Sequence, residues 1–224
     1  MAAEFNYEKD SKERIPFEHY LQLYQNADPK EIAVRCAVPY QEETQTFIIH
    51  LMGVTYEVRW PEYEIRHIDD LGKDGKQISW YPLEEKANAR ILILRYLTEG
   101  GAAPSTGKFL TYRQVPWGEV YFKQFQGRCL FRLAFGFGSK LEQFSKVMER
   151  IGAKPIKNGD AGYELEFMDH LYIQLMLWAP DEEFPPSAQI LFSDNFPVAF
   201  TQGEDMAVVG DVTIDMIKAL STKV

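Results

Sequence analysis

Three adjacent carboxylates, Asp181, Glu182 and Glu183, come shortly after an apolar run that ends at Trp178. Packing of a strand does not need adjacent acids at its end, so these side chains are the first candidates for chemistry. Together with Asp160 from a nearby turn, they could offer carboxylate oxygens to a hard cation or to an arginine or lysine of a partner. Trp178 could line the same site.

The same acids could instead serve only local structure. One or two of them could cap a helical turn near Ser187, where their oxygens would accept hydrogen bonds from free backbone N–H groups. The sequence leaves the two interpretations open, because aromatic residues around a core strand, such as Trp178, are more often core than pocket.

The histidines form no metal motif. None of His19, His50, His67 and His170 has a second histidine four residues away, which is the spacing that puts two imidazoles on one helix face. His67 with its acidic neighbours, or Asp169 with His170, could each give two ligands to a divalent ion. The sequence favours ordinary surface residues at both places, and it assigns no metal, cofactor or catalytic residue.

Residues 105–108 form an incomplete phosphate-binding loop. The motif needs a glycine where Ala102 stands and a serine or threonine where Phe109 stands, and it should follow a strand rather than a helix. Nucleophilic catalysis gains little support as well. Arg128 and Arg132 could activate Cys129 in a cleft, but its apolar neighbours favour a buried, inert thiol.

Charge and composition narrow the class of protein. The 224 residues carry 33 acidic and 24 basic side chains, a net charge of −9. Nucleic acid and anionic membranes are therefore disfavoured as partners, whereas a cationic ligand, a metal or a basic partner protein is not. Cys36 and Cys129 are expected to be reduced and buried. Without a signal peptide or an apolar run of membrane-spanning length, we expect a cytoplasmic protein.

The hydrophobic pattern predicts an α+β fold, because strands and helices do not alternate regularly. A period of two predicts hairpins over 47–60 and 163–178, the second turning at Asp169 and His170. A period of 3.6 predicts helices over 83–97, 117–135 with a break near Gly127, 141–151 with a cap at Ser139, and 204–220. We expect a frayed tail at 1–14 and a single compact domain over 15–224, antiparallel hairpins packed against several helices, with any seam near 100–107.

Short motifs in a shared order between residues 30 and 215 carry a family likeness. They are Gly53–Tyr56, Arg95–Leu97, Gly107–Arg113, Gly118 with Tyr121 and Phe125, Phe135–Gly136, Gly159–Asp160, Asp181–Pro185 and Ile190–Phe192.

In this order the motifs resemble a family of uncharacterised bacterial and archaeal proteins recorded only as a domain of unknown function (number 3786). The resemblance implies one compact domain and supplies no catalytic residues. Because some family members are joined to iron–sulfur cluster domains in anaerobes, it also implies a link to anaerobic redox or corrinoid enzymes. This chain has no cysteines for such a cluster.

Two classes of function follow. The first is a non-catalytic accessory domain that binds a small ligand or a partner protein, with Asp160, Trp178, Asp181, Glu182 and Glu183 as candidate binding residues. The alternative is a metal-assisted, hydrolase-like enzyme that uses the acidic block Asp181–Glu183. The sequence names no ligand, cofactor or oligomeric state.

Overall fold

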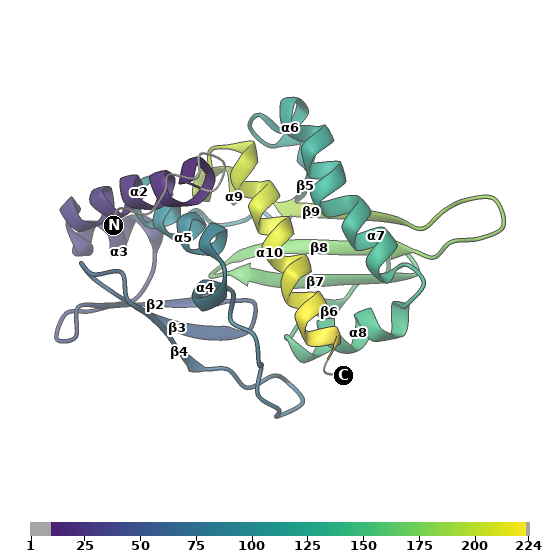
Figure 1. The fold of residues 1–224 in the computed structure, drawn as a ribbon, viewed down its shortest axis with the longest axis horizontal. Helices are drawn as coiled ribbons and strands as arrows, with labels where there is room; N and C mark the ends of the chain where they lie inside the picture. The colour runs from purple at the N-terminus through teal and green to yellow at the C-terminus, as the bar shows by residue number, and fades with distance from the viewer. Residues whose placement is uncertain (1–9, 223–224) are drawn as a thin grey trace, which may run out of the picture.

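The computed structural model describes residues 10–222, which form a nine-stranded antiparallel sheet with helices packed across it (Figure 1). The strand order is β4-β3-β2-β7-β8-β9-β5, with β1 beside β2 and β6 beside β7. This is the α+β fold of antiparallel hairpins and helices that the sequence predicts. None of the described helices is long and apolar enough to cross a membrane.

The sheet and the helices that cover it are built from the following segments. The strands are β1 Tyr40–Gln41, β2 Thr46–Leu51, β3 Val54–Arg59, β4 Ile65–Asp69, β5 Phe109–Thr111, β6 Lys154–Pro155, β7 Ala161–Met168, β8 Leu171–Trp178 and β9 Ser187–Ser193. The helices are η1 Asp10–Arg14, α2 Ile15–Asn26, α3 Pro29–Cys36, α4 Pro82–Glu85, α5 Ala87–Glu99, η2 Tyr112–Gln114, α6 Gly118–Phe125, η3 Gln126–Phe131, α7 Arg132–Phe137, α8 Leu141–Arg150, α9 Phe196–Ala199 and α10 Gly203–Ser221.

Both predicted hairpins are confirmed. Strand β2 pairs with β3, and β7 pairs with β8 across the turn at Asp169 and His170, where His170 has a left-handed backbone (φ 67°). The two halves of the sheet meet at one residue pair, Leu51 opposite Met168. Because this pairing is so short, the helices that span both halves carry much of the connection between them.

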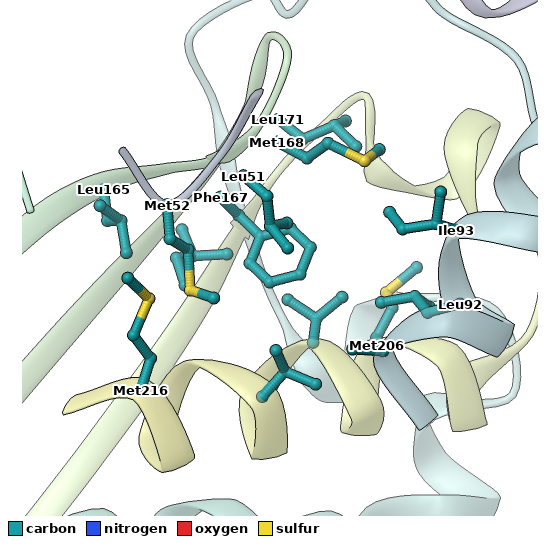
Figure 2. Packing of buried hydrophobic residues seen from close by; sticks show 14 of the residues in the cluster. Leu51, Met52, Leu92, Ile93, Leu165, Phe167, Met168, Leu171, Met206 and Met216 are labelled. Carbon is teal, nitrogen blue, oxygen red and sulfur yellow. The ribbon is translucent and has the colours of Figure 1, made fainter. Parts of the chain in front are cut away.

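One buried cluster contains residues from both sides of the predicted seam at 100–107. Figure 2 shows a part of it, where side chains from the strands and their turns meet side chains from α5 and α10. The labelled residues are Leu51, Met52, Leu165, Phe167, Met168 and Leu171 on the sheet side, and Leu92, Ile93, Met206 and Met216 on the helix side.

Helix α10 runs diagonally across the sheet, between α5 and the α6–η3–α7 segment (Figure 1), and is buried along almost its whole length. A buried carboxylate needs a charged or hydrogen-bonded partner. Asp211 pairs with Arg128 and Arg132, whose Nη1 lies 2.8 Å from Oδ1 of Asp211. Asp215 pairs with Arg132 at 2.5 Å and with Lys86 at 2.9 Å. These ion pairs tie α10 to the helices on both sides.

The segment 118–137 is helical throughout. The predicted break near Gly127 is instead a π-helical stretch, Gln126–Phe131, between two α-helical stretches. In a π-helix the hydrogen bonds close around one more residue per turn, so the chain changes its pitch without interrupting the helix. Cys129 of this stretch is buried against α10, where its Sγ lies 3.4 Å from the carbonyl oxygen of Ala207.

Four local predictions need correction. The predicted helix over 83–97 is divided at Lys86, whose backbone is extended, into the short α4 and the longer α5. Helix α8 begins after Lys140 and its N-cap makes no side-chain hydrogen bond, so the predicted cap at Ser139 is wrong. The segment after Ser187 is strand β9 rather than a helical turn. Of the predicted frayed tail, residues 1–9 lie outside the described part of the chain, and Asp10–Arg14 form a π-helical turn.

The close contact between Gly210 and Cys129 gives the first testable prediction. A Cβ built at Gly210 would lie 2.6 Å from the Cys129 Sγ. Gly210→Ala should therefore lower the free energy of unfolding by about 1–3 kcal/mol through overpacking. Chemical denaturation measures this, and Cys129→Ala in the same chain should recover most of the loss. A Gly210→Ala variant as stable as the wild type would show that η3 and α10 are not packed this closely.

The pH dependence of stability should depend on Asp205. Its Oδ1 lies 2.6 Å from Nη1 of Arg95, yet burial, which outweighs the charge of Arg95, raises the pKa of Asp205 to about 7. Between about pH 4 and pH 7 the unfolded chain would lose this proton while the folded chain keeps it, so stability falls as the pH rises.

We therefore expect the free energy of unfolding of the wild type to fall, relative to that of Asp205→Asn, by roughly 4 kcal/mol between about pH 4 and pH 7. Denaturation of both proteins at several pH values measures this difference. A difference that does not change with pH would show that Asp205 stays ionised and paired with Arg95.

Candidate functional site

Two of the predicted binding residues hold their own loops in place. The Oδ1 atom of Asp181 accepts hydrogen bonds from the backbone N–H groups of Glu183 (2.9 Å) and Phe184 (2.7 Å). This is the local turn that aspartate side chains commonly form. The Oδ2 atom of Asp160 accepts from the backbone N–H of Ala179 at 2.8 Å. The carboxylate of Asp181 therefore closes a turn after β8 without capping a helix, whereas that of Asp160 joins the loop before β7 to the first residue after β8.

The remaining members of the predicted site are spread over the same end of the sheet. Glu182 and Glu183 are exposed, and Trp178 is half-buried where β8 pairs with Ser187 of β9. No group of three or more His, Cys, Asp or Glu side chains among residues 10–222 is placed to hold a metal ion. Recognition of a cation or a partner by this acidic block stays a prediction.

A cleft of about 510 Å³ lies elsewhere, between the loop that follows α5 and the turn between β7 and β8. We call it the loop–turn cleft. Its walls are Ala37, Tyr96, Gly101–Ser105, Asp169–Tyr172 and Asn195.

Asn195, which follows β9, fastens the two walls of the cleft to each other. Its Nδ2 donates to the carbonyl oxygens of Ala103 and His170, both at 3.0 Å. Its Oδ1 accepts from Oγ of Ser193 at 2.6 Å, and the same oxygen of Ser193 accepts from the backbone N–H of Tyr172. Because Asn195 is buried and uses both ends of its amide, it is a structural member of the wall rather than a free ligand contact.

Asp194 holds the outer part of the same loop. Its carboxylate accepts from Oγ of Ser105 (2.6 Å), from the backbone N–H of Thr106 (3.0 Å) and from the hydroxyl of Thr106. The hydrogen bond from Ser105 holds the pKa of Asp194 below its ordinary value. Asp194 thus occupies the hydrogen-bond donors of Ser105 and Thr106 that a bound phosphate would need. This agrees with the conclusion from the sequence that residues 105–108 do not form a complete phosphate-binding loop.

The charged groups of the cleft are few. Asp169 is the one carboxylate in its lining, and its side chain is 13% exposed. His50 orients that carboxylate through its Nδ1, 2.7 Å from Oδ1, and through its backbone N–H, 3.0 Å from Oδ2. No lysine or arginine lines the cleft, and His170 is its one imidazole. The cleft can therefore accept hydrogen bonds or a positive charge more readily than it can hold an anion.

The hydroxyls of Ser105 and Tyr96 in the cleft lining are both engaged in hydrogen bonds within the chain. Oγ of Ser105 donates to Asp194, and the hydroxyl of Tyr96 donates to the carbonyl of Cys36 at 2.7 Å. Burial raises the pKa of Tyr96.

Both cysteines are free and buried, as the sequence predicts. Burial raises the pKa of Cys36 to about 11 and raises that of Cys129 as well. Neither thiol is therefore prepared to act as a thiolate nucleophile at neutral pH.

The family described as Domain of unknown function (DUF3786) matches residues 28–216, most of the described fold, and the chain belongs to this family. No curated protein and no solved structure matches the chain.

Replacing Asn195 tests whether it fixes the cleft. Asn195→Ala removes the hydrogen bonds to Ala103 and His170 and leaves the hydroxyl of buried Ser193 without its acceptor, which should cost about 1–3 kcal/mol. Hydrogen exchange should also become faster at residues 101–105. Asn26→Ala is the matched control, because Asn26 makes one exposed hydrogen bond to Gln22. Equal stability losses in the two variants would contradict the role of Asn195.

Proposed function

We propose that the protein is a non-catalytic binding domain that takes a small, neutral or cationic organic molecule into the loop–turn cleft. The observation that carries this proposal is the charge of the lining, in which Asp169 has no lysine or arginine beside it. A phosphate or carboxylate ligand would meet a like charge there without a basic partner.

The size and lining of the cleft support the same function. Small-molecule sites are concave, mostly apolar and roughly 300–1,000 Å³ in volume, with a few polar groups that orient the ligand. The cleft of about 510 Å³ lies in this range. Tyr96, Leu171 and Tyr172 supply apolar surface, while Asp169 and His170 supply polar atoms. An apolar or aromatic body with one amine or hydroxyl group fits this combination.

Two other functions suggested by the sequence remain untested predictions. One is the link to anaerobic redox or corrinoid enzymes, for which the binding domain would serve as an accessory. The other is the metal-assisted hydrolase using Asp181–Glu183, for which the described residues form no ligand cluster.

Three probes of matched size test the ligand class. Benzylamine and benzyl alcohol at millimolar concentration should shift the backbone amide NMR signals of Ala103 and His170, whereas benzoate should not. Asp169→Asn should remove most of any preference for benzylamine over benzyl alcohol, because the carboxylate supplies the charge.

A variant that fills the cleft tests whether the probes bind there. Ala103→Leu adds volume to the wall and should weaken binding of both probes at least tenfold. Ala179→Leu makes the same change in an exposed loop elsewhere and should not. If all three probes leave the cleft signals unmoved, or benzoate binds as well as benzylamine, the proposed ligand class is wrong.

A further inference from the structure

The polar side chains that line the loop–turn cleft are, with one exception, engaged in hydrogen bonds within the chain. The engaged side chains are those of Tyr96, Ser105, Asp169, Tyr172 and Asn195. The exception is His170, whose imidazole has no hydrogen-bond, ion-pair or ring partner among residues 10–222. In the lining of the cleft, His170 is therefore the side chain with both ring nitrogens left for a ligand.

The backbone of His170 is held from both sides. Its N–H donates to Oε1 of Glu166 at 3.0 Å, and its carbonyl oxygen accepts from Nδ2 of Asn195 at 3.0 Å. Its φ of 67° lies in the left-handed region, which glycine adopts without a steric cost. A histidine carries that cost, and its imidazole has no polar partner inside the described chain to offset it. The imidazole at this turn is better explained by what it binds than by what it holds in place.

Asp169, the residue before His170, keeps capacity for a ligand as well. His50 donates one hydrogen bond to each carboxylate oxygen, from Nδ1 to Oδ1 at 2.7 Å and from its backbone N–H to Oδ2 at 3.0 Å. An ionised carboxylate has about four acceptor positions, so positions on both oxygens stay open. The carboxylate is thus fixed in direction and still able to bind an ammonium group.

We propose that Asp169 and His170 form a two-point site for an amino alcohol, a site that depends on the proposed binding function and narrows its ligand class. Asp169 binds the ammonium group and His170 binds the hydroxyl group. A neutral imidazole donates through one nitrogen and accepts through the other, and a hydroxyl also does both. Because consecutive Cα atoms lie about 3.8 Å apart, the amine and the hydroxyl of the ligand are placed on neighbouring carbons.

A matched pair of probes isolates the hydroxyl group. Phenethylamine has an aromatic body and an amine, and phenylethanolamine adds a hydroxyl on the carbon next to that of the amine. At about pH 8 an ordinary imidazole is neutral and an alkylamine is charged. Titration followed by the amide NMR signal of Ala103 measures both affinities. The better enantiomer of phenylethanolamine should bind the wild type roughly three- to tenfold more tightly than phenethylamine, the gain expected of one added hydrogen bond.

Two variants assign the two groups of the ligand to their residues. His170→Gly should bind both probes about equally, with an affinity for phenethylamine like that of the wild type. Its thermal midpoint should be at least as high as that of the wild type, because glycine adopts the left-handed backbone freely. Asp169→Asn should weaken both probes alike and so leave their ratio unchanged, since the ammonium group is common to both.

Gln45→Gly is the matched control. Gln45 is exposed and has a left-handed backbone (φ 52°) in the turn before β2, outside the cleft lining. This variant relieves the same backbone conformation and should keep the preference for phenylethanolamine.

The outcomes separate the amino-alcohol site from the proposed function. A wild type that binds both probes equally, or a His170→Gly variant that keeps the preference, would overturn the site and leave the binding function standing. A His170→Gly variant that melts well below both the wild type and Gln45→Gly would show that the imidazole serves the fold, which also overturns the site. If neither phenethylamine nor benzylamine binds the wild type, the binding function and the amino-alcohol site are both wrong.

Discussion

The pairing of the carboxylates on α10 is the constraint on which the rest of the structure depends. A helix buried on nearly every side would have to leave Asp211 and Asp215 uncompensated unless basic residues came from its neighbours. They come from both sides, as Lys86 at the start of α5 and as Arg128 and Arg132 of the α6–η3–α7 segment. Once these pairs form, the rotation of both neighbouring helices is fixed. The face of α6–η3–α7 opposite α10 is then committed to solvent or to a partner.

Strong periodic segments of the sequence predict much of this fold. Alternation in β7 and β8 and the 3.6-residue period of α5 reflect direct burial, since Leu165, Ile173 and Leu94 all face the core. The errors arise where local signals compete. The polar start at Ser187 suggested a helical turn, but pairing of β9 with β8 decides its conformation. Near Gly127 the glycine suggested a break, whereas packing of Cys129 against α10 keeps the chain helical.

The loop–turn cleft could not be predicted from the sequence, and the reason is physical. Its walls come from segments that are far apart in the chain, and hydrogen bonds of Asn195 to Ala103 and His170 bring them together. Neither asparagine nor alanine in a loop carries a signal of its own. The acidic block Asp181–Glu183 differs from the cleft in being easy to find in the sequence. Its residues are adjacent in sequence and therefore conspicuous, yet Asp181 spends its Oδ1 on the two N–H groups that follow it.

The loop at 101–105, which forms one wall of the loop–turn cleft, is anchored at both ends, and this affects the free energy of ligand binding. At the end of α5, a Cβ at Gly100 would lie 2.5 Å from the carbonyl oxygen of Ala199, so the chain passes where only glycine fits. Arg35 of α3 donates to the carbonyl of Leu97 at 2.7 Å and holds the same helix end. At the far end, Asp194 fixes Ser105. A loop held in this way loses little conformational freedom when a ligand enters. Since ordering a flexible loop subtracts from affinity, a wall already ordered by Arg35 and Asp194 leaves the apolar contacts of the cleft available for binding.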